Sequence, residues 1–221
     1  MAHLRLAVLI SGRGSNMAAI AEACAEGRID ASVCTVIADK PDAGGLTRAR
    51  DFGLNTRAVA FRGFADRNLF ERALSEAIEE SRPHVVVLAG FMRILSANFV
   101  ETYLGRMLNI HPSLLPKYRG LHTHRRVLDA EEREHGSSVH FVTAELDGGP
   151  IVLQSKVIVK PGDTESSLSA RVQATEYIIY PQALGWLAEE RLAWRNGGPW
   201  FDGKPLAYPL LEEFNDAISA N

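Results

Sequence analysis

The sequence predicts an α/β protein with a doubly wound, mostly parallel sheet and one or more antiparallel strands in its C-terminal half. Through residues 4–89, apolar runs typical of buried strands alternate with segments whose apolar residues recur at helical spacing. This β-α-β order is typical of parallel strands joined by crossover helices. After residue 100 the strand-like runs are separated by long loops, so the second half has a different organisation.

The first half alternates regularly between strands and helices. Residues 4–10 form a buried strand, and a helix begins near Met17 and stops at Gly27, a residue that favours helix ends. Asp66 is an expected N-cap for a later helix, because its carboxylate can accept a hydrogen bond from a free backbone N–H. The remaining elements of this half are strands at residues 33–38, 56–60 and 85–89, and a helix at residues 43–51 that Gly53 closes.

The second half contains three predicted strands and one long helix. The strands lie at residues 107–110, 138–143 and 151–159. Pro181 lies within the long helix and is expected to bend it, because proline removes a backbone hydrogen bond. One stripe of that helix is formed by Leu168, Val172, Thr175, Ile179 and Trp186.

Length and composition indicate one ordinary globular domain. The chain has 221 residues, of which 46% are hydrophobic and 23% charged. Since no Ser/Gly-rich or Pro-rich linker divides it, we expect a single domain over residues 1–221. The formal net charge of -3 does not favour nucleic acid or an anionic membrane as a partner, so any bound phosphate needs a local site.

The sequence also indicates a cellular compartment. No apolar run approaches the ~20 residues that a membrane-spanning helix needs, and the first predicted strand leaves no room for a signal segment ahead of it. The two cysteines, Cys24 and Cys34, belong to no close Cys/His cluster. We therefore expect a cytoplasmic location without membrane attachment.

The strongest candidates for chemistry are Asn109, His111 and Asp147. Asn109 and His111 lie two residues apart near the end of a predicted strand, so their side chains leave the same face. An Asn N–H directed at an oxyanion contributes ~3 kcal/mol in comparable sites, and His111 can exchange a proton near neutral pH with Asp147 as its carboxylate partner. His140 precedes Asp147 on a predicted strand and is expected nearby. This set contains no nucleophilic side chain and suits direct attack of a substrate amine on an acyl carbon.

A glycine-rich segment, Ser-Gly-Arg-Gly-Ser-Asn at residues 11–16, lies between the first strand and the first helix. There, backbone N–H groups and the positive end of the helix can bind a phosphate. The segment lacks the glycine spacing of dinucleotide-binding folds and the Gly-Lys-Ser/Thr of a P-loop, which disfavours a nicotinamide cofactor and ATP. A glycine-rich turn without a ligand is the alternative.

Four histidines raise the alternative of a metal site: His122, His124, His135 and His140. His122 and His124 have no carboxylate or thiol at helical or turn spacing, as a structural zinc site would need. We therefore expect no metal.

Four segments resemble the folate-dependent formyltransferases. Residues 109–116 (Asn-Ile-His-Pro-Ser-Leu-Leu-Pro) and 146–150 (Leu-Asp-Gly-Gly-Pro) carry the resemblance to the family. Residues 11–16 and 88–95 (Leu-Ala-Gly-Phe-Met-Arg-Ile-Leu) narrow the resemblance to the formyltransferases of purine synthesis. The resemblance extends from about residue 6 to about residue 181, without a departure at a catalytic position, and it implies a Rossmann-like formyltransferase fold.

The resemblance implies an activity. The formyl group of the co-substrate 10-formyltetrahydrofolate would pass to the amine of glycinamide ribonucleotide, giving formylglycinamide ribonucleotide and tetrahydrofolate in de novo purine (IMP) biosynthesis. Asn109 and protonated His111 would stabilise the tetrahedral oxyanion, while Asp147 would keep His111 charged and assist proton transfer.

The resemblance also assigns binding residues and divides the chain. Residues 1–100 become the phosphate-binding half, residues 101–195 the catalytic and folate-binding half, and residues 196–221 a tail. The residues implied to bind glycinamide ribonucleotide are Gly14, Ser15, Asn16 and Glu176. The residues implied to bind the folate are Arg67, Met92, Arg93, Ile94, Leu95, Asn109, Thr143, Ala144, Glu145, Leu146 and Asp147.

Other interpretations stay open beside this one. A formyltetrahydrofolate hydrolase would use water in place of the amine in a nearly identical site. A non-catalytic nucleotide-binding or folate-binding module is the other alternative, although binding alone would not require Asn109, His111 and Asp147 together. Both a monomer and a homodimer are compatible with the sequence.

Overall fold

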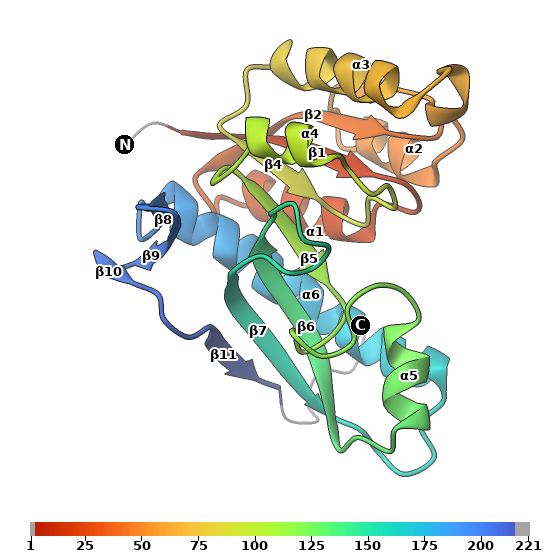
Figure 1. The fold of residues 1–221 in the computed structure, drawn as a ribbon, viewed down its shortest axis with the longest axis vertical. Coiled ribbons are helices and arrows are strands. Elements are labelled where there is room, and N and C mark those ends of the chain that lie inside the picture. The colour runs from red at the N-terminus through yellow and green to blue at the C-terminus, as the bar shows by residue number, and fades with distance from the viewer. Residues whose placement is uncertain (1–2, 215–221) are drawn as a thin grey trace.

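The computed structural model describes residues 3–214, and this part of the chain contains two sheets (Figure 1). Their strands are β1 (Leu4–Ile10), β2 (Ala31–Ala38), β3 (Thr56–Ala58), β4 (Val85–Leu88), β5 (Met107–His111), β6 (Glu134–Phe141), β7 (Ile151–Ile158), β8 (Leu192–Arg195), β9 (Gly198–Phe201), β10 (Lys204–Pro205) and β11 (Leu210–Glu213). The large sheet has the order β11-β7-β6-β5-β4-β1-β2-β3, and the small sheet has the order β10-β9-β8.

Helices flank both faces of the large sheet. They are α1 (Ser15–Ala25), α2 (Gly44–Asp51), α3 (Arg67–Glu79), α4 (Ala97–Thr102), α5 (Thr123–Asp129) and α6 (Glu165–Ala188), with a short 3-10 helix η1 (Phe61–Gly63). The predicted N-cap at Asp66 is confirmed, because its Oδ1 accepts a hydrogen bond from the backbone N–H of Leu69 at 2.9 Å. Thr164 caps α6 in the same way and accepts from the N–H of Ser167 at 3.1 Å.

Successive side chains of β1 enter two different cores, because the side chains of a strand alternate between its faces. Leu6, Val8 and Ile10 belong to the core that α1, α2 and α6 cover. Ala7 and Leu9 belong to the core beneath α3 and α4. All five side chains are fully buried, so β1 is covered on both faces, as parallel sheets require.

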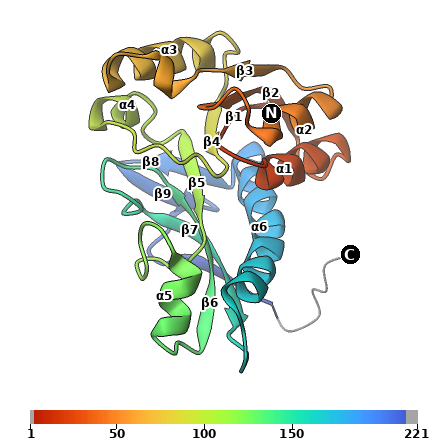
Figure 2. The ribbon, with the colours of Figure 1, turned by 90° about the vertical axis from the view of Figure 1, so that its right-hand side faces the viewer.

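The direction of the strands changes in the second half of the sheet. The pairs from β3 through β2, β1 and β4 to β5 are parallel. Strand β6 is antiparallel to both β5 and β7, and β11 pairs parallel with β7 at the sheet edge. Helix α6 runs along the face formed by β6 and β7 (Figure 2). These findings confirm the predicted doubly wound, mostly parallel sheet with antiparallel strands in its C-terminal half.

Strand β6 differs most from its predicted position, because it begins at Glu134 rather than at residue 138. In the part of the strand that was not predicted, the buried residues are His135, Gly136 and Ser137, none of which is apolar. Ser137 Oγ lies 2.7 Å from Ser155 Oγ, which lies 2.6 Å from Thr175 Oγ1 on α6. A strand whose buried side chains are satisfied by other hydroxyls shows no apolar run in its sequence. Helices α4 and α5, of six and seven residues, are too short to show a period.

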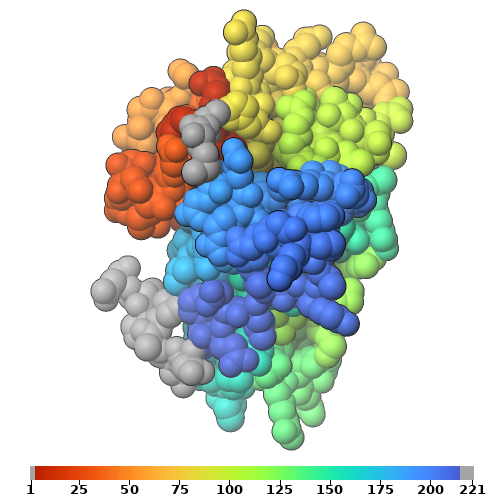
Figure 3. Space-filling view, turned by 90° about the vertical axis from the view of Figure 1, so that its left-hand side faces the viewer, coloured from red at the N-terminus to blue at the C-terminus, as the bar shows by residue number. Residues whose placement is uncertain are grey.

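Within the segment expected as a tail, residues 198–213 contain three strands. Strands β9 and β10 complete the small sheet, and β11 extends the large one. The ring of Phe201 packs edge-on against Trp186 of α6, with centroids 4.9 Å apart. This segment lies across one face of the molecule (Figure 3). Residues 215–221 lie outside the described residues. No helix in the described part of the chain is long and apolar enough to cross a membrane.

Candidate active site

The candidate site lies where neighbouring parallel strands end. Strands β1, β4 and β5 are adjacent in the sheet, and their carboxyl ends therefore lead into loops at the same edge. The loop after β1 is the glycine-rich segment 11–16, and the loop after β4 is segment 90–95. Ligands of open α/β sheets bind at this edge.

His111 and Asp147 face each other across the end of β5. Nδ1 of His111 lies 3.5 Å from Oδ2 of Asp147, and Nε2 of His111 lies 3.0 Å from the backbone carbonyl oxygen of Tyr118. Since a carbonyl only accepts, Nε2 carries a proton. Nδ1 of the same ring faces the carboxylate of Asp147.

Backbone contacts fix the loop that carries Asp147. Asp147 has φ 48, and its Oδ2 accepts a hydrogen bond from the N–H of Gly120 at 2.9 Å. At Gly149 a Cβ atom would lie 1.8 Å from the carbonyl oxygen of Phe141. The loop can therefore pass this close to β6 only with glycine at position 149.

Asn109 is oriented by His140, which lies opposite it in the β5–β6 register. Nδ2 of Asn109 lies 3.1 Å from Nε2 of His140, and Nδ1 of His140 lies 2.9 Å from the carbonyl oxygen of Phe141. Burial lowers the pKa of His140, which favours the neutral ring. Neutral His140 then donates through Nδ1 and accepts through Nε2, so the NH₂ group of Asn109 is held in place with a second N–H free.

Two hollows open on opposite sides of the end of β5. The Asn109 hollow, on the side of α4, is lined by Asn109, His140, residues 93–95 and residues 142–147. The Glu176 hollow has a volume of about 440 Å³, and its lining includes residues 11–16, Ile110, Pro112, Gln173 and Glu176. Asn109 and Ile110 are successive residues of a strand and thus face opposite sides.

The Glu176 hollow contains unusual polar groups. Glu176 is 6% exposed, and burial raises the pKa of its carboxyl group to about 7. Nδ2 of Asn16 donates a hydrogen bond to Glu176 Oε2 at 2.7 Å, whereas Oδ1 of Asn16 is buried without a hydrogen-bond partner. Gly14 has φ 70, and a Cβ there would lie 2.8 Å from Cα of Gly45. The wall of the hollow therefore contains a buried acceptor without a partner, beside a glycine-rich loop with backbone N–H groups.

Residues 4–184 match the family model described as formyl transferase. The chain belongs to the formyl transferase family. It is 52% identical over 203 residues to the phosphoribosylglycinamide formyltransferase of Escherichia coli K12, which covers 92% of this chain and 96% of the relative. It is 42% identical to the protein of the same name from Haemophilus influenzae, covering 91% of this chain and 95% of the relative.

Solved structures of the family have the same fold. A phosphoribosylglycinamide formyltransferase from Coxiella burnetii superposes with a TM-score of 0.90 at 46% identity, covering 95% of this chain and 100% of the other. A glycinamide ribonucleotide transformylase from Symbiobacterium toebii gives a TM-score of 0.87 at 41% identity, covering 91% and 95% of the two chains. The Rossmann-like formyltransferase fold expected from the sequence is confirmed.

The structure gathers most of the residues that the resemblance to formyl transferases implied. Gly14, Ser15, Asn16 and Glu176 all line the Glu176 hollow. The expected folate residues line the Asn109 hollow, with the exceptions of Arg67 and Met92. Arg67 is the exposed first residue of α3. Met92 is 62% exposed and lies on the wall of the Glu176 hollow instead.

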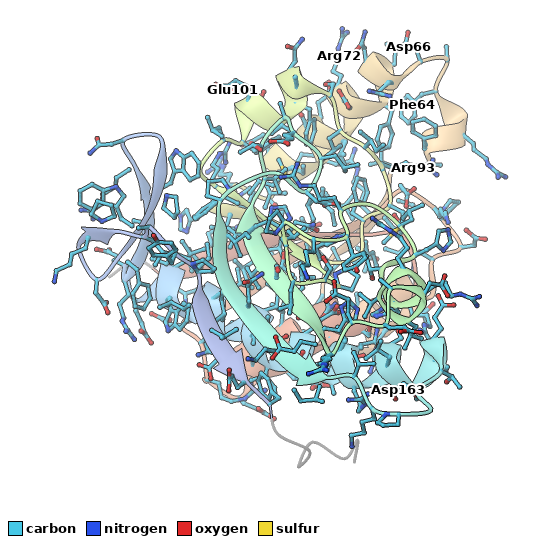
Figure 4. The ribbon with its side chains drawn as sticks, turned by 60° about the horizontal axis from the view of Figure 1, so that its bottom comes forward. Phe64, Asp66, Arg72, Arg93, Glu101 and Asp163 are labelled. Carbon is cyan, nitrogen blue, oxygen red and sulfur yellow. The ribbon has the colours of Figure 1, made fainter. Side chains whose placement is uncertain are left out.

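Arg93 lines the Asn109 hollow, but its charged group is engaged elsewhere. Its Nε donates to Oδ2 of buried Asp39, and its guanidinium lies 4.3 Å from the centroid of the Phe61 ring. Figure 4 shows Arg93 within the fold, below Phe64. Its backbone groups therefore remain for a ligand, while its side chain is held by Asp39.

The remaining histidines form no metal site among residues 3–214. His124 lines the Glu176 hollow, and its Nδ1 lies 2.9 Å from Nε2 of His135. Burial lowers the pKa of both rings, that of His135 to about 3, so one neutral ring donates to the other. Within the described residues, no three His, Cys, Asp or Glu side chains are placed to hold a metal ion.

Some groups of this site were not predicted from the sequence. The carbonyl of Tyr118 and the N–H of Gly120 are backbone groups, and sequence reveals neither their direction nor their partners. Gln173 donates to Ser15 Oγ at 3.2 Å from a helix whose residues read as an ordinary amphipathic stripe. The contact between His140 and Asn109 follows from strand register, and only the proximity of His140 to the site was expected.

Proposed function

We propose that this formyl transferase passes the formyl group of 10-formyltetrahydrofolate to the amine of glycinamide ribonucleotide, in de novo purine synthesis. One observation carries the proposal. Two hollows lie on opposite faces of β5 near its carboxyl end, Asn109 and Asp147 line one of them, and His111 contacts Asp147. The relatives named phosphoribosylglycinamide formyltransferase support the same acceptor over water or a purely binding role.

Glycinamide ribonucleotide would occupy the Glu176 hollow. Its phosphate would accept hydrogen bonds from the backbone N–H groups of residues 14–16 at the start of α1. Asn16 and Glu176 would then face the glycinamide end and the ribose, because both lie in the same wall. The unpartnered Oδ1 of Asn16 would accept from an N–H or O–H of the substrate, which removes the cost of a buried acceptor without a partner.

The folate would occupy the Asn109 hollow. Ile94, Leu95 and Leu146 supply apolar walls, and the backbones of residues 93–95 and 143–147 supply the polar groups that a pterin ring needs. Arg67 lies outside this lining, as expected of a residue that pairs with the terminal glutamate of the folate rather than with its ring. Met92 would contact the ligands from the opposite wall.

The reaction needs no covalent enzyme intermediate. The amine nitrogen forms a bond to the formyl carbon, and the carbonyl electron pair moves to the oxygen. The free N–H of Asn109 would donate to this oxyanion, and the positive charge of protonated His111 would stabilise it through space, with Asp147 facing Nδ1 of His111. When the bond between carbon and N10 breaks, the proton lost by the amine balances the one gained by tetrahydrofolate, with Asp147 assisting through water.

The proposed location is the cytoplasm, which the unpaired cysteines Cys24 and Cys34 support. A single domain over residues 1–221 likewise stays a prediction.

Absorbance of 10-formyltetrahydrofolate tests the proposal. The purified protein is incubated with this folate, with and without glycinamide ribonucleotide, beside the Asn109→Ala variant. We expect deformylation that depends on the acceptor and that falls at least ~10²-fold in the variant. Equal conversion without the acceptor would identify a hydrolase. Tight binding of both ligands without conversion would identify a binding module.

A further inference from the structure

The loops that line the two hollows are joined by a side-chain hydrogen bond. Oγ of Ser11 accepts a hydrogen bond from the backbone N–H of Met92 at 2.8 Å. Ser11 follows β1 directly, and Met92 lies in the loop after β4. The N–H of Ser11 also donates to the carbonyl oxygen of Gly90 at 3.1 Å. Residue 11 therefore contacts the loop after β4 through both its backbone and its side chain.

Ser11 occupies a position between the two proposed ligands. It is 4% exposed and begins the glycine-rich segment 11–16, which lines the Glu176 hollow. Met92 directly precedes residues 93–95, which line the Asn109 hollow. The hydroxyl of Ser11 thus connects the loop proposed to bind phosphate with the loop proposed to bind folate.

The Ser11 hydroxyl supplies the partner of the Met92 N–H because the hydrogen-bond ladder between β1 and β4 ends before this point. The parallel register of β1 and β4 ends at Leu9 and Leu88, and Gly90 turns the chain with φ +77. Beyond this turn, the N–H of Met92 bonds to the Ser11 side chain rather than to the backbone of β1. Without that hydroxyl, the N–H of Met92 would lose its partner, and segment 92–95 would lose its attachment to segment 11–16.

We propose that Ser11 is a positioning residue that couples the two substrate sites. Binding of a ribonucleotide phosphate to segment 11–16 fixes Ser11, and Ser11 in turn holds segment 92–95 in the conformation that receives the folate. Each ligand then raises the affinity for the other by the same factor, as linkage requires. The inference rests on the proposed function. If Ser11 couples the two sites, the formyl donor binds most tightly when the acceptor is already bound.

Titration calorimetry measures this coupling without turnover. Tetrahydrofolate, which carries no formyl group, is titrated into the protein with and without saturating glycinamide ribonucleotide. We expect the ribonucleotide to lower the Kd of tetrahydrofolate at least ~5-fold in the wild type. In Ser11→Ala the ratio of the two Kd values should fall to near one, while each ligand alone still binds.

A matched control separates coupling from loss of a buried hydroxyl. Ser137→Ala removes the fully buried hydroxyl that bonds to Ser155, on β6 rather than on either loop, and it should keep the wild-type ratio. The proposal is overturned if the wild type binds both ligands without coupling, if Ser11→Ala keeps the coupling, or if Ser137→Ala loses it equally. Failure of the wild type to bind either ligand would instead refute the proposed function.

Discussion

Replacement of Glu176 by glutamine should make the protein more stable above neutral pH. The Glu176 carboxyl is buried against Asn16 and has its pKa raised from 4.5 to about 7 by burial. Glutamine keeps the size of the side chain and an oxygen that accepts from Asn16, but it carries no charge to bury. The variant therefore isolates the cost of the carboxylate.

The size and sign of the effect follow from the pKa values. The pKa of Glu176 is higher in the folded state than in the unfolded state, so the folded state binds the proton more tightly. The protonated carboxyl therefore stabilises the fold fully below pH 4.5, and this stabilisation is lost as the pH rises through 7. At ~1.4 kcal/mol per pH unit, the loss approaches about 3 kcal/mol. The difference in unfolding free energy, Glu176→Gln minus wild type, should grow by that amount between about pH 4.5 and 8.

Urea unfolding of both proteins at several pH values measures this difference, and other titrating groups cancel because both proteins share them. Glu22→Gln, at an exposed position on α1, is the control and should give no such change with pH. A Glu176→Gln difference that stays constant from pH 5 to 8 would refute the reasoning. The stabilised variant should also show a ~10-fold higher KM for glycinamide ribonucleotide, because Glu176 is proposed to face this substrate in its hollow.

Three further outcomes test the proposed catalytic loop and the proposed folate site. Asp147→Asn should lower kcat at least ~10²-fold with little change in Tm, because it removes the charge facing the imidazole but keeps the shape. Gly149→Ala should lower Tm far more than Gly148→Ala: a Cβ at 149 would lie 1.8 Å from a backbone oxygen, whereas at 148 it meets a flexible glutamate side chain. Arg67→Ala should raise the KM for the folate ~10-fold with kcat unchanged. Arg72→Ala removes an exposed side chain that points outward from α3 (Figure 4) and should leave this KM unchanged. Equal effects of the two substitutions would refute the assignment of Arg67.

The sequence predicted the parallel half of the fold well because its strands are continuous apolar runs. It predicted the second half less well for two different reasons. In β6, buried serines replace apolar residues and bond to Ser155 and Thr175, so only tertiary contacts explain their burial. In the small sheet, by contrast, a signal was present: Asn196-Gly197 has φ 52 and φ 80, as the Asn-Gly turn of a two-residue hairpin requires. That pair predicts the β8–β9 hairpin.

Candidate site residues were recognisable from the sequence where the proposed role belongs to a side chain. Asn109, His111 and Asp147 are recognisable by residue type and spacing, and the structure brings them together. The carbonyl of Tyr118 and the N–H of Gly120 act through the backbone, so their residue types carry no information about the role. Arg93 shows that residue type can also mislead. Its positive charge suggests ligand binding, yet its guanidinium donates a hydrogen bond to Asp39.

The alternation of side chains along β5 explains why the reaction would be placed at the end of a strand. Asn109 faces one hollow and Ile110 the other, so ligands in the two hollows are separated by the sheet everywhere except at its edge. Pro112 has no N–H to continue the ladder, and the chain leaves the sheet directly after His111. An amine from one side can therefore reach an acyl carbon on the other only past this point. The roles proposed for Asn109, His111 and Asp147 fit this position, because the oxyanion would form where the two substrates meet.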